Sequence, residues 1–258
     1  MQQNKIVSQD EWLNARKALL AKEKQMTRLR DQLSAERRAL PWVKVEKNYV
    51  FDTTRGKRTL ADLFDGRTQL IVKHFMLAPG QKEGCVGCSF ETDHIEAALV
   101  HLEHHDVTFV NVARAPLAEI ESYKKRMGWQ CKWVSSAGSD FNYDFKASFT
   151  KEQVAGGEAY YNYRKGKVPL EDLSGFSVFL KNDKGEIFNT YSTFGRGAEE
   201  VMGTYMLLDL TPKGRNETGP EFNLTDWVRH RDRYESSGHV NDKGQWVAAP
   251  ASAGGCCH

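Results

Sequence analysis

Two cysteines separated by two residues offer the clearest chemistry in this sequence. Cys85 and Cys88 follow a nearly continuous apolar run at residues 69–76 and precede apolar residues in helical spacing. At the start of a helix, unpaired N–H groups and the positive end of the dipole stabilise a thiolate, so such cysteines reach pKa values of about 3.5 to 7.5 rather than about 8.5. Cys88 lies one helical turn further on the same face. We predict that Cys85 is the attacking thiol and Cys88 the resolving thiol.

The remaining cysteines leave a second chemistry open. Cys131 stands between two tryptophans and is predicted to be a packed core residue. Cys256, Cys257 and His258 end a tail of small residues, which predicts a flexible tether that relays electrons to the dithiol or binds a soft ion such as Cu(I), Zn(II) or Hg(II). The alternative is an end of the chain with incidental thiols. A soft-metal binding or transfer protein is therefore the runner-up to a redox protein.

Four residues near the dithiol are predicted to support it. His74 closes the apolar run before the dithiol loop, and Gly84 keeps the approach to Cys85 open. Ser89 is placed to add a local hydrogen bond. Arg196 is expected either to contact a pocket beside the dithiol or to cap the last helix.

Two other groups carry weaker signals. His101 and His105 are four residues apart in a helical segment, a spacing that suits metal binding, but the neighbouring Glu103 and His104 indicate a solvated helix end. An aromatic set is predicted to be mostly core, with some members walling a pocket beside the dithiol. Its members are Phe141, Tyr143, Phe145, Tyr160, Tyr161 and Tyr163.

Strands and helices around the dithiol predict an α/β fold. Residues 69–76 and 107–112 are buried-type strands, and the helical segment 89–105 between them completes a βαβ unit. A helix at 116–127 closed by Gly128, a short strand at 132–134 and an irregular insertion at 138–167 follow. A hairpin at 176–181 and 186–191 and a helix at 198–210 come last. This order predicts a mixed sheet with helices on both faces.

The N-terminal residues read as one long helix from 8 to 38. Ser8 is a good N-cap, and Glu11 occupies the capping-box position. Trp12, Leu19, Met26 and Leu33 recur every seven residues, which suits either an amphipathic helix laid against its own domain or an arm that reaches a second subunit in a homodimer. We therefore divide the chain into an arm at 1–42, an α/β domain at 43–235 and a tail at 236–258.

Composition excludes several classes of protein. The 258 residues are 40% hydrophobic and 27% charged, with a formal net charge of +2, as in an ordinary soluble globular protein. No basic face with interleaved aromatics suggests a nucleic-acid partner. The N-terminus lacks the apolar region of a secretory signal, and no apolar stretch approaches the roughly 20 residues of a membrane span. We expect a cytoplasmic protein without a membrane contact.

Longer stretches of the sequence resemble a known family. They lie at 70–76, 83–90, 106–110, 114–117, 126–129, 133–145, 191–197, 202–205 and 209–212. Together they are similar to a thioredoxin-like family of unknown function whose members are predicted dithiol–disulfide oxidoreductases. The resemblance covers nearly the whole chain and implies a thioredoxin-like domain with Cys85 and Cys88 as its redox pair. The resemblance does not imply a particular substrate. From the dithiol itself we expect a thiol or disulfide substrate, protein or small molecule, and no cofactor.

Two departures narrow that expectation. Thioredoxins place a proline directly before the strand that faces the dithiol, but Ser174 and Gly175 precede the corresponding strand here. Exchange with peptides through the usual groove is therefore not expected. Thiol peroxidases of the peroxiredoxin type need a Thr or Ser three residues before the reactive cysteine and a Pro four before that, where this chain has Lys82 and Ala78. Peroxidase activity by that arrangement is disfavoured.

Overall fold

The computed structural model describes residues 4–215, 227–234, 239–240 and 246–247. It divides into two compact units, Met1–Trp42 and Val43–His258. The predicted tail at 236–258 lies almost entirely outside the described residues, including Cys256, Cys257 and His258.

The first unit is built on the helix α1 (Gln9–Arg38). Ser8 caps it, and the side chains and backbone of Ser8 and Glu11 form the predicted capping box. No residue of α1 is buried, and the heptad residues Trp12 and Met26 are 51% and 64% exposed. The two interpretations of this seam, packing against its own domain and pairing with a second subunit, both stay predictions.

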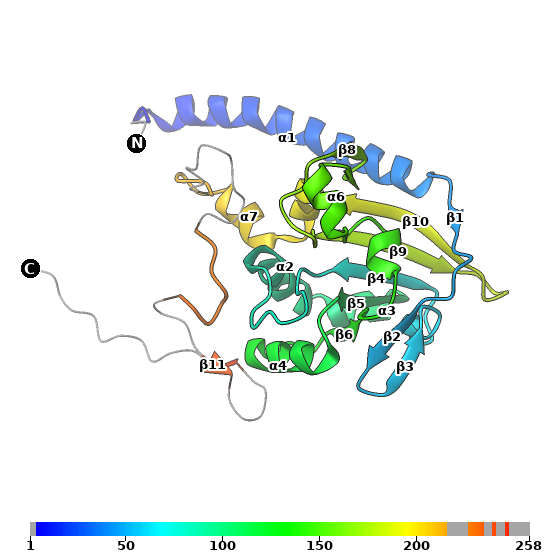
Figure 1. Cartoon of the computed structure of the whole chain (residues 1–258). Coiled ribbons are helices and arrows are strands. Elements are labelled where there is room, and N and C mark those ends of the chain that lie inside the picture. Colours follow the sequence, from blue (N-terminus) through cyan, green and yellow to red (C-terminus); the bar gives the residue numbers. More distant parts are fainter. Residues whose placement is uncertain (1–3, 216–226, 235–238, 241–245, 248–258) are drawn as a thin grey trace, which may run out of the picture. The chain divides into compact units, whose positions relative to one another are not determined.

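The second unit holds an eight-stranded mixed sheet in its described part. The strand order is β1-β10-β9-β4-β5-β6-β2-β3, and Figure 1 shows β10, β9, β4, β5 and β6 following one another across the sheet. These strands are β1 (Val43–Lys44), β2 (Val50–Thr53), β3 (Gly56–Thr59), β4 (Gln69–His74), β5 (Val107–Ala113), β6 (Lys132–Ser135), β9 (Gly175–Lys181) and β10 (Ile187–Phe194). Two further strand pairs are β7 (Ala159–Tyr161) with β8 (Arg164–Gly166), and β11 (His239–Val240) with β12 (Trp246–Val247).

Helices connect and cover these strands. They are η1 (Asp62–Phe64), α2 (Val86–Glu96), α3 (Leu99–His104), α4 (Leu117–Met127), α5 (Phe141–Asp144), α6 (Lys151–Gly156), η2 (Gly195–Val201) and α7 (Gly203–Leu208), of which η1 and η2 are 3₁₀-helices. Side chains of α2, α4 and α7 enter one buried cluster, whereas η1 and α5 contribute to the other. The expected α/β fold with helices on both faces of the sheet is confirmed.

A thioredoxin-like arrangement lies at the centre of the sheet. β4 pairs in parallel with β5 through six residues, so β4, α2 and β5 form the predicted βαβ unit. On its other side β4 pairs antiparallel with β9, which continues through a hairpin into β10. Every residue of β5 is buried, as expected of a central strand that is covered on both faces.

Successive side chains of β4 point to opposite faces of the sheet. Leu70 and Val72 belong to the cluster on one face, whereas Ile71 and Phe75 contact the cluster on the other. The second of these clusters contains Cys88. The alternation therefore decides which residues of β4 lie beneath the dithiol.

Two helical segments differ from the sequence prediction. The segment expected at 89–105 begins earlier, at Val86, and is interrupted between α2 and α3. The closing helix expected at 198–210 is instead a 3₁₀ segment followed by the short α7. Glycines explain the second difference: Gly195 has φ +55°, and a Cβ on Gly197 would lie 1.9 Å from Thr193 Oγ1, so this segment follows β10 in a tight turn rather than an α-helix.

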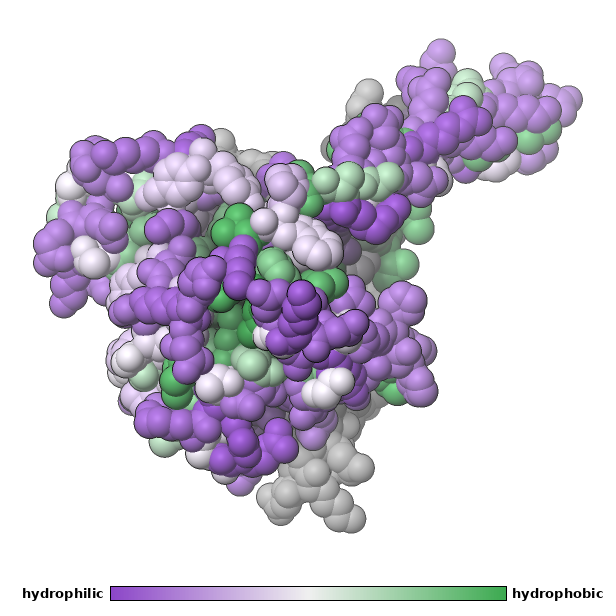
Figure 2. Space-filling model, turned by 90° about the vertical axis from the view of Figure 1, so that its right-hand side faces the viewer, coloured by the Kyte–Doolittle hydropathy of each residue, from purple (hydrophilic) through white to green (hydrophobic). Residues whose placement is uncertain are grey.

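Polar side chains dominate the surface seen in Figure 2. Hydrophobic residues on that face are gathered between charged ones. In the part of the chain that the structure describes, no helix is long and apolar enough to cross a membrane.

Candidate dithiol site

The dithiol lies where a loop from β4 enters α2. Cys85 is the N-cap of α2, and its N–H donates to the Met76 carbonyl at 3.0 Å, which ties the loop back to the end of β4. Both thiols are free. Cys85 is partly exposed, whereas Cys88 is 1% exposed. An incoming molecule can therefore meet Cys85, and Cys88 lies behind it.

The two thiols differ in acidity. A hydrogen bond from the Cys88 thiol lowers the pKa of Cys85 to about 6 against the effect of burial, with help from the N–H groups of Cys88 and Gly87 and the charge of Lys73. Burial raises the pKa of Cys88, and the neighbouring Cys85 adds to that rise. At neutral pH this arrangement favours a Cys85 thiolate beside a protonated Cys88.

A buried ion pair lies beneath the dithiol. Lys73 on β4 is fully buried and pairs with the carboxylate of Glu91, which is 4% exposed and one turn beyond Cys88 on α2. The Lys73 ammonium also donates to the Ser174 hydroxyl and lies 4.5 Å from the centroid of the Phe176 ring. Lys73 is thus held beneath α2 by Glu91 of that helix and by Ser174 and Phe176 at the start of β9.

Electrostatics couples this pair to the thiols. Burial would lower the pKa of Lys73, but the Cys88 thiol, the Glu91 carboxylate and the Cys85 thiol together raise it. Burial raises the pKa of Glu91, and Lys73 opposes that rise. Lys73 is therefore the fixed positive charge that faces the dithiol, and Glu91 is a carboxylate with an increased affinity for a proton.

The sequence analysis missed Lys73 and Glu91 as site residues. A signal for Lys73 was available, because a lysine inside an apolar run that is covered on both faces must have a buried partner. The period of two places Lys73 on the same side of the sheet as Ile71 and Phe75. Glu91 carried a weaker signal, since its i+3 spacing from Cys88 puts it on the dithiol face of α2.

His74, a predicted supporting residue, points to the opposite face of β4. Its Nε2 is 2.9 Å from the Ser177 hydroxyl, and its ring stacks on Phe141 with centroids 5.5 Å apart. Burial and the neighbouring Lys73 charge lower the pKa of His74 to about 3, so the ring is neutral. The structure therefore places His74 beside Phe141 and Ser177, on the face of the sheet opposite the thiols.

Gly84 and Ser89, also predicted, are both next to the dithiol. A Cβ on Gly84 would lie 2.4 Å from the Phe75 ring and 2.9 Å from Tyr123, so only glycine fits there. The Ser89 hydroxyl donates to the Cys85 carbonyl at 2.8 Å and lies 2.8 Å from the Tyr123 hydroxyl. These residues fix the backbone on either side of Cys85.

Arg196 contacts its own 3₁₀-helix, whereas Tyr161 contacts the segment that carries Ser174. Arg196 is exposed, and its Nε is 2.5 Å from Glu199 Oε1 within η2. Of the predicted aromatic set, Tyr161 comes close to the site: its hydroxyl donates to the Ser174 carbonyl at 2.7 Å. Burial raises the pKa of Tyr161 to about 12, and the charges of Lys73, Cys88 and Glu91 also act on it.

Cys131, His101 and His105 do not join the dithiol. Cys131 is 2% exposed, burial raises its pKa, and Asn111 Nδ2 lies 3.2 Å from its sulfur. His101 and His105 are exposed at α3 and just beyond it. Among the residues that the structure describes, no group of three or more His, Cys, Asp or Glu side chains could hold a metal ion. Cys256, Cys257 and His258 lie outside those residues.

Solved structures similar to this chain include peroxiredoxins of low sequence identity. A serine mutant of PrxQ from Xylella fastidiosa is 15% identical with a TM-score of 0.40, covering 64% of this chain and 94% of its own. Peroxidoxin BcpB from Mycobacterium tuberculosis is 11% identical with a TM-score of 0.42, covering 64% and 95%. Reduced 2-Cys peroxiredoxin from Plasmodium vivax is 13% identical with a TM-score of 0.39, covering 64% and 90%. We take no function from similarities of this size.

Sequence comparison identifies the family more directly. No protein with a curated description matches the chain. A family model described as "Bacterial protein of unknown function (DUF899)" matches residues 1–234, which include α1, the dithiol and the whole eight-stranded sheet but not the separate pair β11 and β12. The chain therefore belongs to the DUF899 family of bacterial proteins.

Proposed function

We propose that this protein is a thiol–disulfide oxidoreductase that uses Cys85 and Cys88. The observation that carries the proposal is the difference between two neighbouring thiols. Cys85 is partly exposed and has a lowered pKa, whereas Cys88 is buried and has a raised pKa. A low pKa makes the thiolate available at neutral pH, and the neighbouring buried thiol is placed to resolve a mixed disulfide.

The proposed reaction transfers two electrons from the dithiol to a disulfide substrate. The Cys85 thiolate attacks one sulfur of the substrate, forms a mixed disulfide and releases the other sulfur as a thiolate. Cys88 then loses its proton, attacks the Cys85 sulfur and releases the second substrate thiolate, which takes a proton from solvent. The products are an oxidised Cys85–Cys88 disulfide and a substrate reduced to two thiols. The reverse sequence oxidises a dithiol substrate.

Glu91 is the proposed acceptor of the Cys88 proton. Because Cys88 is 1% exposed, bulk water has little access to its thiol. Glu91 is 4% exposed, lies one turn further on the same helix face, and has its pKa raised by burial, which suits it to accept a proton. Lys73 stays protonated and offsets the negative charge on whichever sulfur carries it.

Alkylation of the reduced protein tests the proposed thiolate. Cys131, Cys256 and Cys257 are replaced by serine, and the reaction of iodoacetamide with Cys85 is followed by mass as a function of pH. We expect a midpoint near pH 6, set by the pKa of Cys85 at about 6. Cys88 should react only after unfolding. The matched control is Cys85→Ser, in which fast labelling should disappear.

Redox titration tests the exchange itself. In glutathione buffers we expect both thiols to be lost and recovered together, and Cys88→Ser should instead retain a mixed disulfide on Cys85 that mass spectrometry can identify. The absence of reversible dithiol oxidation would contradict the proposal. The same titration with Cys256 and Cys257 restored tests whether these cysteines relay electrons to the dithiol, through a change in how many thiols are oxidised together.

A further inference from the structure

A segment far from the dithiol in sequence is bound beside it. Residues 227–234, which we call the strap, pack against the same core cluster as α2. Val228 is 1% exposed, and the ring of Trp227 is 6.0 Å from that of Phe90 and 6.2 Å from that of Tyr205, measured between centroids. Apolar contacts therefore dock the strap on α2 and α7.

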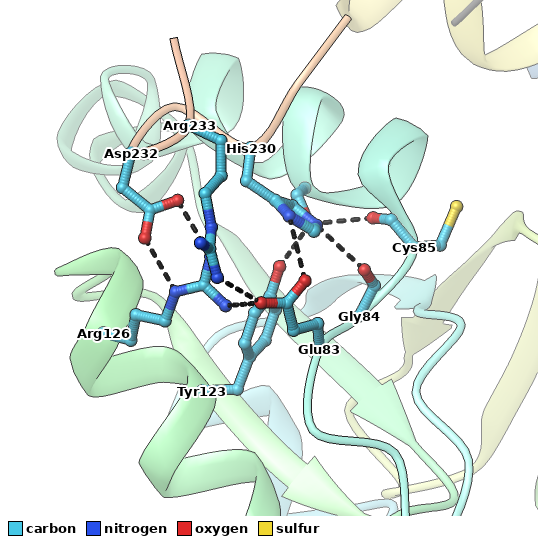
Figure 3. A network of polar contacts seen from close by, with 9 residues as sticks. Glu83, Gly84, Cys85, Tyr123, Arg126, His230, Asp232 and Arg233 are labelled. Atoms are coloured by element: carbon cyan, nitrogen blue, oxygen red, sulfur yellow. Dashed lines mark hydrogen bonds and ion pairs between the residues drawn. The ribbon is translucent and has the colours of Figure 1, made fainter. Parts of the chain in front are cut away.

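His230 connects the strap to the dithiol loop. Its side chain is nearly buried, at 6% exposed, and its Nε2 lies 2.9 Å from the Gly84 carbonyl oxygen (Figure 3). A carbonyl can only accept, so Nε2 carries the hydrogen and donates. The Tyr123 ring lies beside His230 at a centroid distance of 5.9 Å. The bond joins residues 146 positions apart in the chain.

Ion pairs also hold the strap and the dithiol loop to α4. Arg126 on α4 contacts Asp232 through two nitrogens at 2.7 and 3.0 Å and also contacts Glu83 at 2.6 Å. Arg233 contacts the same Glu83 oxygen at 2.7 Å, and His230 Nδ1 is 3.7 Å from the other. Glu83, the residue before Gly84, therefore lies among three basic groups, two of them on the strap (Figure 3).

These contacts bear on Cys85 through its backbone. The Gly84 carbonyl accepts from His230, and the Cys85 carbonyl accepts from the Ser89 hydroxyl at 2.8 Å. The peptide units on both sides of Cys85 are thus held by side chains. The Cys85 thiolate needs the N–H groups of Gly87 and Cys88 to point at its sulfur, so the orientation of this short backbone segment controls its stability.

We propose that His230 is a positioning residue for Cys85, and that docking of the strap and the redox state of the dithiol are linked. This rests on the proposed function. The docked strap holds the Gly84–Cys85 peptide in the orientation that stabilises the reduced thiolate form. Because coupling between two equilibria is reciprocal, formation of the Cys85–Cys88 disulfide, by transfer of two electrons to a disulfide substrate, weakens docking of the strap by the same factor.

Substitution of His230 tests the positioning role. His230→Leu removes the N–H donor, His230→Gln supplies another donor at a similar reach, and His101→Gln makes the same chemical change at an exposed site away from the dithiol. In the background with Cys131, Cys256 and Cys257 replaced, we expect His230→Leu to raise the alkylation midpoint of Cys85 by about half a pH unit, which lowers thiolate at pH 5.5 by about threefold. Both glutamine variants should stay close to the parent.

The possible outcomes test the positioning role of His230 and the proposed function separately. A folded His230→Leu protein with the parent's alkylation profile would overturn the positioning role while leaving the proposed function intact. A parent midpoint near the ordinary thiol value of about 8.5 would overturn the proposed function and this inference with it. If His230→Leu does not fold, Asp232→Asn releases the strap from Arg126 without touching Gly84, and we expect a smaller shift in the same direction.

Hydrogen exchange tests the reciprocal half. Amides of the strap should exchange faster in the oxidised protein than in the reduced protein, whereas those of β5, which is buried throughout, should not change. A merely structural strap would exchange at the same rate in both redox states. Equal rates in both states would therefore overturn the link.

Discussion

Lys73 and His74 are adjacent on β4 and both fully buried, yet one is charged and the other neutral. Lys73 faces α2, where the Glu91 carboxylate and the Cys85 thiolate supply negative charge. His74 faces the other side of the sheet, where its partners are the Ser177 hydroxyl and the Phe141 ring. Lysine starts from an ordinary pKa of about 10.4 and histidine from about 6.5, and burial lowers both. On the α2 side the countercharge more than offsets burial, whereas on the other side nothing among the described residues does.

The contrast between Lys73 and His74 shows which side of β4 can stabilise a thiolate. An uncompensated charge in a protein interior is costly, and a buried histidine avoids that cost by staying neutral. A lysine retains its charge when a carboxylate and thiols approach it. The α2 side of β4 is therefore an ionic environment suited to thiolate chemistry, and the opposite side is packing.

The largest effect is expected from removing the charge on the α2 side. Lys73→Met leaves Glu91 buried without a countercharge, which should cost about 3–5 kcal/mol of unfolding free energy. It also removes a positive charge that lowers the pKa of Cys85, so the alkylation midpoint should rise. Urea unfolding and alkylation across pH measure the two effects separately.

A double variant separates charge from stability. Lys73→Met with Glu91→Leu replaces the whole ion pair by apolar residues, a change that is often neutral or stabilising. We expect most of the stability to return while the raised midpoint of Cys85 remains. A double variant with the parent's alkylation profile would mean that Lys73 does not stabilise the thiolate.

The next largest effect is expected from His74, on the opposite side of β4. The pKa of His74 is lowered in the folded protein to about 3, so between that pH and the ordinary value of about 6.5 the unfolded state binds a proton that the folded state does not. Stability is therefore fully present above pH 6.5 and is lost as the pH falls, by up to about 1.4 kcal/mol per unit.

His74→Gln removes this titration and keeps a polar group near Ser177. Between pH 6.5 and 5 the variant should lose about 2 kcal/mol less stability than the parent, as measured by urea unfolding at each pH. Its Cys85 alkylation profile should be unchanged, in contrast to that of Lys73→Met. Equal acid sensitivity in variant and parent would show that His74 is not the group responsible.

Local patterns explain how much of the fold was predictable. The capping box of α1, the buried run that becomes β4 and the closure of α4 at Gly128 all depend on residues within a few positions of one another. The dithiol at the start of α2 belongs to the same class, because the strand, the loop and the helix are consecutive. The periodicity of apolar residues and the capping residues predict such local features.

The unpredicted parts of the site depend on contacts between distant segments. Glu91 meets Lys73 because α2 crosses over β4, and no local pattern states that the two side chains converge. His230 reaches Gly84 across 146 positions, from a segment with no regular secondary structure. The prediction that His74 supports the dithiol relied on closeness along the chain, whereas the alternation of a strand gives that place to Lys73.

The smallest expected effects concern two serines, Ser174 just before β9 and Ser177 within it. The Ser174 hydroxyl contacts Lys73 and Glu91, whereas the Ser177 hydroxyl contacts His74. Ser177→Ala leaves a buried imidazole nitrogen without its partner and should cost about 1–3 kcal/mol without moving the Cys85 midpoint. Ser174→Ala deprives Glu91 of a donor, so Glu91 holds Lys73 more strongly and the midpoint should rise by less than about half a pH unit. Alkylation and urea unfolding of both variants give the comparison, and an equal shift of the midpoint in both would show that the two sides of β4 are not electrostatically separate.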